Sequence, residues 1–327
     1  PLVTRNQEAM LYHKRGRRVG LIVALAVLTA LLSACGDSPA PSATPGTPGP
    51  PPAGGRVLHV TVTTTQIRSM ADAVAGNAAK VTPILQASDD PHAYEPKPSD
   101  VQLIANADLV LRHGMGLDHW LDKVVQNAGG NHPVVTVTTG VKLESGDGEE
   151  SGPDPHVWFD VTNAMTMTRD IRDAMIAADP ANKDAYQANA DAYLATLKQL
   201  DSDIMSQIAT IPPDQRKMVT NHDAFGYYIR RYGLTFVGSV VPSMDSSAEP
   251  SAKQLAELID KIKAEHVRAI FLESSINPKL EKQIAAEAGV NVVDTLYGDT
   301  LGPPNSPAYT YEGMMRYNTQ TIVRALK

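Results

Sequence analysis

Hydrophobic positions follow two alternating spacings from Val57 to the end of the chain. Short runs of β-branched and apolar residues predict strands, and apolar residues at every third or fourth position predict helices between them. The predicted strands are 57–62, 81–85, 109–111, 134–137, 217–220, 235–241, 268–273 and 290–295. The predicted helices are 67–74, 98–106, 117–126, 161–178, 183–211, 224–232, 251–265, 278–288 and 311–326. This alternation favours an α/β fold with mainly parallel sheets flanked by helices.

The helix predicted over residues 183–211 is longer than one small domain needs. Apolar side chains recur along it at threes and fours, and no glycine or proline interrupts it before Pro212. A helix of this length covers roughly 40 Å, because each residue adds about 1.5 Å. We therefore expect two lobes, residues 56–182 and residues 212–327, joined by this one long helix.

The N-terminal part of the chain has a different character. Basic residues at 13–18 precede an apolar run that is shorter than the roughly 20 residues of a membrane span and ends in Leu-Ser-Ala-Cys35. This order resembles a bacterial lipoprotein signal, in which the cysteine is lipidated. We predict a signal peptide over 1–35 with lipidation at Cys35; a short membrane anchor is the alternative. Residues 36–55, rich in Pro, Gly, Ala, Ser and Thr, predict an extended tether.

Charge and cysteine content narrow the partners and the chemistry. The net charge is −7, and residues 1–34 carry +4, which leaves −11 on the remainder. An acidic body argues against nucleic acid as a partner, because phosphates require a basic face. Cys35 is the only cysteine, which excludes an intrachain disulfide and a cysteine-based zinc site.

Three histidines share an unusual placement. His92 and His156 each end an Asp-Pro-His tripeptide, 64 positions apart. His92 and His222 each follow a predicted strand, at the end where open α/β sheets bind their ligands. We interpret the three imidazoles as parts of one site that holds a transition metal. A hydrogen-bonded loop histidine is the alternative reading of each one.

A fourth ligand is expected to be a carboxylate or another histidine. Asp299 lies just past the last predicted strand, where Asp294 and Glu273 compete with it on position. The other histidines of the body give no convergent partner: we interpret His59 and His266 as structural, and His113, His119 and His132 lie near predicted loops or helix starts.

Five motifs in order resemble the cluster A-I solute-binding proteins, the metal-capturing lipoproteins of bacterial zinc or manganese ABC importers. The motifs are residues 90–96, 154–160, 221–227, 271–275 and 297–302. The resemblance covers the chain from Val57 to Lys327 and implies two α/β lobes joined by one long helix. It also implies that His92, His156, His222 and Asp299 bind the metal.

The resemblance also bears on the metal. In this family the third ligand is usually His in zinc proteins and Glu in several manganese proteins, and here it is His222. Three imidazoles and one carboxylate suit Zn²⁺, whereas Mn²⁺ favours more oxygen. We expect Zn²⁺, with Mn²⁺ or Fe²⁺ as the alternative. One departure argues against zinc: the acidic stretch 143–154, which we interpret as a solvated loop, has no histidine where many zinc members carry a histidine-rich loop.

The implied protein is a monomer, lipid-anchored on the outer side of the bacterial cell membrane, that passes its metal to an ABC permease. An adhesin-type lipoprotein with incidental metal binding is one rival. A secreted zinc hydrolase is another, but four protein ligands close a zinc site, and the chain has no His-Glu-x-x-His helix. We therefore expect that the protein is not an enzyme.

Overall fold

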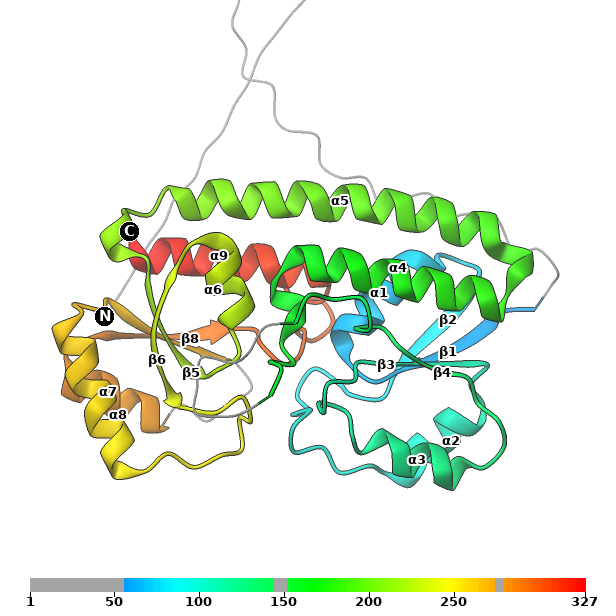
Figure 1. The fold of residues 1–327 in the computed structure, drawn as a ribbon, viewed down its shortest axis with the longest axis horizontal. Helices are drawn as coiled ribbons and strands as arrows, with labels where there is room; N and C mark the ends of the chain where they lie inside the picture. Colours follow the sequence, from blue (N-terminus) through cyan, green and yellow to red (C-terminus); the bar gives the residue numbers. More distant parts are fainter. Residues whose placement is uncertain (1–55, 144–151, 274–278) are drawn as a thin grey trace, which may run out of the picture. The chain divides into compact units, whose positions relative to one another are not determined.

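The computed structural model describes residues 56–143, 152–273 and 279–327, except for the side chains of residues 294 and 295 (Figure 1). The predicted signal peptide, the lipidation site Cys35 and the predicted tether lie outside these residues, as do residues 144–151 of the acidic stretch. Among the helices of the described ranges, none is both long and apolar enough to cross a membrane.

Two four-stranded sheets form the framework, and every strand pairing in them is parallel. The strand orders are β2-β1-β3-β4 and β6-β5-β7-β8. The strands are β1 (Leu58–Val62), β2 (Ala79–Pro83), β3 (Leu109–Arg112), β4 (Val134–Thr136), β5 (Lys217–His222), β6 (Thr235–Val241), β7 (Ala269–Glu273) and β8 (Asn291–Leu296). We call each sheet with its flanking helices the first lobe and the second lobe, in chain order. The predicted α/β fold with two parallel sheets is confirmed.

Helices cover both faces of each sheet. In Figure 1, α1 and α4 lie above the first sheet and α2 and α3 below it, whereas α6 and α9 lie above the second sheet and α7 and α8 below it. The helices are α1 (Thr65–Ala75), α2 (Pro98–Ala105), α3 (Leu121–Ala128), α4 (Val161–Ala178), α5 (Lys183–Ala209), α6 (Gly226–Tyr232), α7 (Ala252–Ala264), α8 (Lys279–Ala288) and α9 (Tyr311–Leu326). Parallel strands require such crossover connections, which explains the regular alternation of the sequence.

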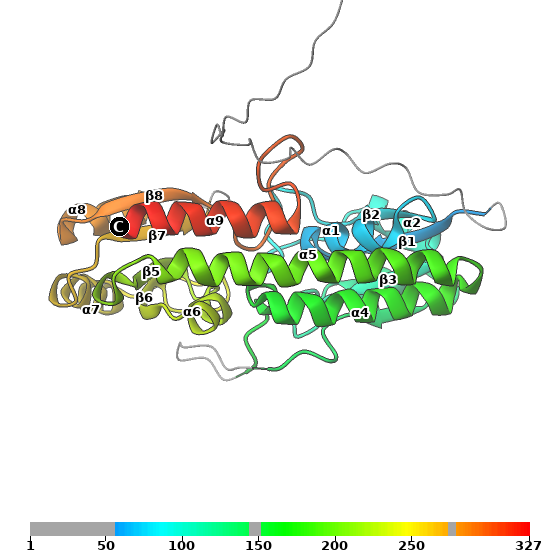
Figure 2. The ribbon, with the colours of Figure 1, turned by 90° about the horizontal axis from the view of Figure 1, so that it is seen from above.

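Helix α5 links the two lobes. It has 27 residues and packs on α1 and α4 of the first lobe and on α9 of the second, and Figure 2 shows it passing across both. Its buried side chains recur at threes and fours, as a one-sided apolar stripe requires: Tyr186, Ala190, Tyr193, Leu197, Leu200, Ile204 and Ile208. The long linking helix is therefore confirmed.

The apolar core continues from one lobe into the other. One cluster of buried side chains includes Val60 of the first sheet, Leu197 of α5 and Phe271 of the second sheet. Between the lobes, the rings of Phe159 and Phe225 lie 4.3 Å apart, centroid to centroid. A core that is shared in this way marks no boundary between the lobes. The limits at 56–182 and 212–327 therefore stay a prediction.

Three elements differ from the sequence expectation. Strand β2 begins at Ala79, two residues earlier than predicted, since Leu58 of β1 pairs with Ala79. Helix α3 begins at Leu121, because the preceding residues form turns around the buried carboxylate of Asp118. His222 is the last residue of β5 and does not follow the strand.

Candidate metal centre

Four side chains converge between the lobes. One donor atom each from His92, His156, His222 and Asp299 lies within 4.8 Å of all the others. The Nε2 atoms of His92 and His156 are 3.3 Å apart. Oδ1 of Asp299 lies 3.3 Å from Nε2 of His156, and Oδ2 lies 3.4 Å from Nε2 of His222 and 3.6 Å from Nε2 of His92. The structure thus brings together the four residues that the sequence predicts.

These separations match those of donors around a small metal ion. A metal bound at about 2.1 Å by four tetrahedral ligands places neighbouring donor atoms about 3.4 Å apart. Nε2 of His222 and Oδ1 of Asp299 are buried and have no hydrogen-bond partner among the described residues. A buried polar atom without a partner is costly, and a cation at the centre would satisfy both atoms.

In the first lobe, each Asp-Pro-His tripeptide fixes its own histidine. Oδ1 of Asp90 accepts a hydrogen bond of 2.9 Å from the backbone N–H of His92. Oδ1 of Asp154 accepts one of the same length from the backbone N–H of His156, and it also lies 2.7 Å from Nδ1 of that ring. The aspartate two residues earlier therefore holds the backbone at both histidines, and at His156 it also orients the imidazole.

In the second lobe, one carboxylate supports both converging side chains. Oε1 of Glu273 lies 2.9 Å from Nδ1 of His222, and Oε2 accepts a hydrogen bond of 3.1 Å from the backbone N–H of Asp299. A Cβ atom at Gly298 would lie 1.7 Å from Oε2, so this approach requires glycine. Glu273, which competes with Asp299 for the ligand role on sequence position, thus lies behind the ligands and does not belong to the converging set. The side chain of the other competitor, Asp294, lies outside the described residues.

The segment that carries Asp299 also binds the first lobe. Nε2 of Gln66 in α1 donates to the carbonyl oxygens of Gly298 (3.1 Å) and Asp299 (2.9 Å). Oγ1 of Thr65 accepts from the backbone N–H of Leu301 at 2.8 Å. Asp299 is therefore held from both lobes, although its strand belongs to the second.

The charges at the site are strongly coupled. Burial alone would lower the pKa of His156, but the hydrogen bond to Asp154 and the negative charges of Asp154 and Asp299 raise it to about 10. Burial likewise opposes the charge of His222, but Glu273 and Asp299 raise its pKa. The pKa of His92 is lowered, because burial and its two neighbouring imidazoles outweigh Asp299. Burial would raise the pKa of Asp299, but the three imidazoles hold it well below its usual range.

The chain matches the sequence model of a protein family over residues 60–325, and that family is described as "Zinc-uptake complex component A periplasmic". The chain belongs to this family. Its members are metal-binding, substrate-binding proteins of ABC transporters. This match confirms the resemblance to the cluster A-I proteins. The confirmation covers the family and not the identity of the metal.

Relatives within the family are named for several metals. The "Manganese-binding lipoprotein MntA" of Halalkalibacterium halodurans is 33% identical over 274 residues, which is 83% of this chain and 89% of the relative. The "Iron ABC transporter substrate-binding lipoprotein MtsA" of Streptococcus pyogenes serotype M1 is 28% identical over 95% of this chain and 99% of its own length. The solved structure of the periplasmic zinc-binding protein TroA from Treponema pallidum has a TM-score of 0.77 and 28% identity, and covers 83% of this chain and 99% of its own.

Two residues beside the converging side chains differ from the sequence interpretation. The interpretation of residues 143–154 as a solvated loop is wrong at Asp154, which is fully buried against His156. The sequence indicates no convergent partner for His113, which is fully buried with its Nε2 2.8 Å from the carbonyl oxygen of Pro155. Burial is the main cause that lowers the pKa of His113 to about 4, so it is neutral near pH 7. Asp90 stands two residues before His92, as Asp154 does before His156. This match is the sequence signal that could identify Asp154.

Four further histidines of residues 56–327 lie away from the converging set. His59, His119 and His266 are exposed, and the half-buried His132 contacts the carbonyl oxygen of Ala107. None of these four belongs to the group of side chains that could hold a metal in the described part of the chain.

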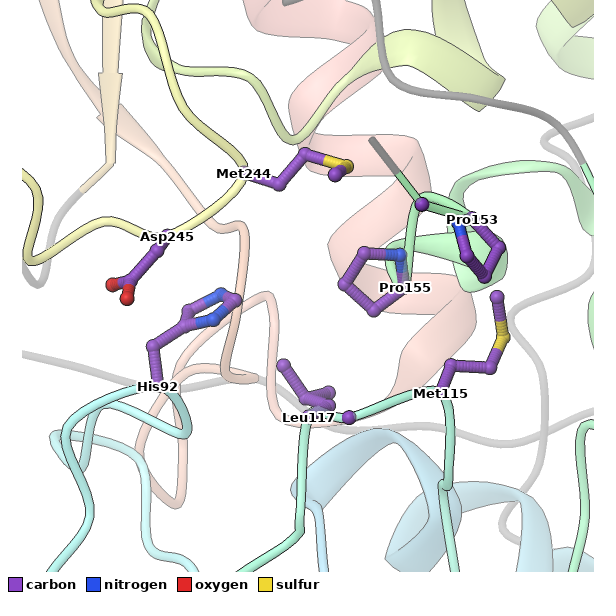
Figure 3. Close-up of a pocket in the computed structure, with 9 residues that line it drawn as sticks. His92, Met115, Leu117, Pro153, Pro155, Met244 and Asp245 are labelled. Carbon is purple, nitrogen blue, oxygen red and sulfur yellow. The ribbon is translucent and has the colours of Figure 1, made fainter. Parts of the chain in front are cut away.

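A cavity of about 320 Å³ opens beside the site (Figure 3). His92 lines it, together with Met115 and Pro155 of the first lobe and Met244 and Asp245 of the second. His92 is also the most exposed of the four side chains, at 9%, against 0% for His156 and His222. Of the four converging side chains, His92 is therefore the one that faces this cavity.

Proposed function

We propose that the chain captures one divalent transition-metal ion through His92, His156, His222 and Asp299 and delivers it to the permease of an ABC importer. The observation that supports this proposal most directly is the convergence of three imidazole nitrogens and a carboxylate at the spacing of metal ligands. Four protein ligands surround the ion, so the site offers no open position for a substrate of catalysis. Binding and release, without chemistry, is the function that such a site supports.

We propose Zn²⁺ as the cargo. Zn²⁺ is borderline between hard and soft metal ions, which suits imidazole nitrogen. Four ligands in a tetrahedron are its usual environment. The Irving–Williams order adds a general preference for Zn²⁺ over Mn²⁺ and Fe²⁺ at a nitrogen-rich site. The buried carboxylates of Asp154 and Glu273 support this choice, because they make two of the imidazoles better donors.

Mn²⁺, or Fe²⁺, is the second candidate cargo. Both carboxylate oxygens of Asp299 face the imidazoles, so the site can offer three nitrogens and two oxygens. Mn²⁺ accepts more oxygen ligands than Zn²⁺ does. The names of MntA and MtsA, which refer to manganese and iron, favour the same candidate.

We further propose that the mature protein is a monomer held outside the cytoplasm by lipid on Cys35, with residues 36–55 as its tether. The order of basic segment, apolar run and cysteine supports the anchor. Several relatives are named as lipoproteins, which agrees with it. Mass spectrometry of the membrane fraction should detect a diacylglyceryl group on Cys35, and a protein released without lipid would contradict the proposal.

Competition calorimetry tests the cargo. We expect one ion per chain, with Zn²⁺ displacing Mn²⁺ at equal concentration. His92→Ala and His222→Ala should each weaken binding by roughly 10² to 10³, since a four-ligand zinc site contributes about 10–16 kcal/mol in total. His119→Ala, which removes an exposed imidazole, is the matched control. Equal metal uptake by all variants would refute the site, and tighter Mn²⁺ binding would refute zinc as the cargo.

A further inference from the structure

The three imidazoles of the proposed site are not supported equally. Nδ1 of His156 contacts Asp154, and Nδ1 of His222 contacts Glu273. Within residues 56–143, 152–273 and 279–327, no atom forms a hydrogen bond with Nδ1 of His92. His92 is therefore the one ligand whose ring is oriented by its metal-facing contacts alone.

This difference has a chemical consequence once a metal is bound. Nε2 of His92 faces the other ligands, so a metal would take its lone pair, and Nδ1 must then carry a proton. A histidine that binds metal almost always donates this second N–H to a carboxylate, a carbonyl or water. The metal-bound state thus creates a donor at His92 that needs an acceptor.

Asp245 of the second lobe lines the same cavity as His92. Figure 3 draws Asp245 on the segment between β6 and α7 and His92 on the segment after β2. Oδ1 of Asp245 accepts hydrogen bonds from the backbone N–H (2.8 Å) and the hydroxyl (2.6 Å) of Ser247. Oδ2 has no hydrogen-bond partner among the described residues, so it is available as an acceptor.

Asp90 already links the segment that carries His92 to the segment that carries Asp245. Oδ1 of Asp90 accepts from the backbone N–H of His92, and Oδ2 of the same carboxylate accepts from the hydroxyl of Ser246 at 2.7 Å. Asp90 thus connects the residue next to Asp245 with the backbone of His92, across the two lobes. The charge on Asp245 is secure at neutral pH: burial opposes it, but the hydrogen bonds from Ser247 and the charges of His92 and His222 lower its pKa.

We propose that Asp245 is a positioning residue for metal binding: its Oδ2 accepts a hydrogen bond from Nδ1 of His92 when the site is loaded. This inference rests on the proposed function of the four-ligand site. It gives each ligating imidazole a carboxylate partner, and it makes the third pair the only one of the three that spans the lobes. The bound metal and this contact between the lobes then stabilise each other, and metal dissociation is slowed.

Asp245→Asn tests this role with little change in shape. The asparagine keeps an oxygen for Ser247, but it places an NH₂ group where an acceptor is needed. Loss of such an outer partner typically weakens metal binding 10–100-fold, and we expect the loss mainly as faster Zn²⁺ release to a chelator. Glu249→Gln is the matched control, because it removes one negative charge from the same segment at an exposed position. It should stay within about twofold of the wild-type protein.

A second measurement separates the contact from general electrostatics. In ¹⁵N-histidine-labelled, Zn²⁺-loaded protein, the Nδ1 proton of His92 should be visible and slow to exchange in the wild type and in Glu249→Gln, and fast in Asp245→Asn. The inference is overturned if Asp245→Asn releases Zn²⁺ at the rate of Glu249→Gln, or if the Nδ1 proton is unchanged. Failure of the wild-type protein to bind metal would overturn the proposed function instead.

Discussion

The two halves of the site reach the same geometry by different routes. In the first lobe, His92 and His156 are each fixed by an aspartate two residues earlier. In the second lobe, His222 and Asp299 depend on Glu273, which lies far from both in the sequence. The first half is thus built from local motifs, whereas the second half exists only after the sheet has formed. Damage to the second half should therefore affect two ligands at once.

The largest expected effect is that of pH, because protons compete with metal in both halves. His156, with a pKa raised to about 10, is protonated near neutral pH in the metal-free protein and must lose that proton to bind, and the raised pKa of His222 adds to this competition. Affinity therefore rises with pH and falls as pH drops. We expect about 100-fold weaker Zn²⁺ binding for each displaced proton between about pH 7.5 and about pH 5.5.

Calorimetry in buffers of different ionisation enthalpy counts these protons. Wild-type protein should release between one and two, and Asp154→Asn should release fewer, because the pKa of His156 falls when its carboxylate partner is lost. A pH-independent affinity would mean that the imidazoles are not the ligands.

Gly298→Ala should cause the next largest effect. The added methyl group meets Oε2 of Glu273 at 1.7 Å, so the carboxylate must leave both His222 and Asp299. We expect roughly 100-fold weaker metal binding and a loss of about 1–3 kcal/mol in the free energy of unfolding. Gly140→Ala, at an exposed position of the first lobe where φ is not in the left-handed region, serves as a control for binding. Normal metal affinity in Gly298→Ala would contradict the dependence on Glu273.

A direct comparison of the two supporting carboxylates sharpens the contrast. Asp154→Asn removes the partner of one imidazole and should weaken Zn²⁺ binding about tenfold, whereas Glu273→Gln affects two ligands and should approach 100-fold. Competition with a fluorescent chelator measures both variants under one condition. Equal losses would show that Glu273 acts through His222 alone.

The smallest expected effect tests the bridge between the halves. Gln66→Ala removes two buried hydrogen bonds to the carbonyl oxygens beside Asp299, at a cost of about 1–3 kcal/mol in stability. Metal affinity should fall only several-fold, because Glu273 still holds the backbone of Asp299. Gln199→Ala, on the exposed face of α5, is the control in thermal unfolding and in titration. A loss as large as that of Gly298→Ala would assign Asp299 to the first lobe.

The same contrast explains what the sequence could reveal. The alternating spacings predicted each strand and helix to within a few residues, since burial of one face imposes a period on the sequence. The ligands His92 and His156 were visible because their supporting aspartates lie in the same tripeptide. His113 was missed because its contact with Pro155 joins residues 42 positions apart, and neither neighbour in sequence indicates it. The two carboxylates behind the ligands, Asp154 and Glu273, were noticed as acids, but their burial is a property of packing between segments.

The continuous core beneath the site sets how long a captured ion would stay. Swinging the lobes apart would pull side chains such as Phe159 and Phe225 away from each other and expose them to water. Exposing about 200 Å² of apolar surface costs about 5 kcal/mol, so roughly one molecule in several thousand would be open at any moment. Under the proposed function, a loaded receptor is therefore a stable store, and unloading needs work from outside the molecule. Docking on the permease is the event that would supply this work, which would tie release to the presence of a transporter ready to accept the ion.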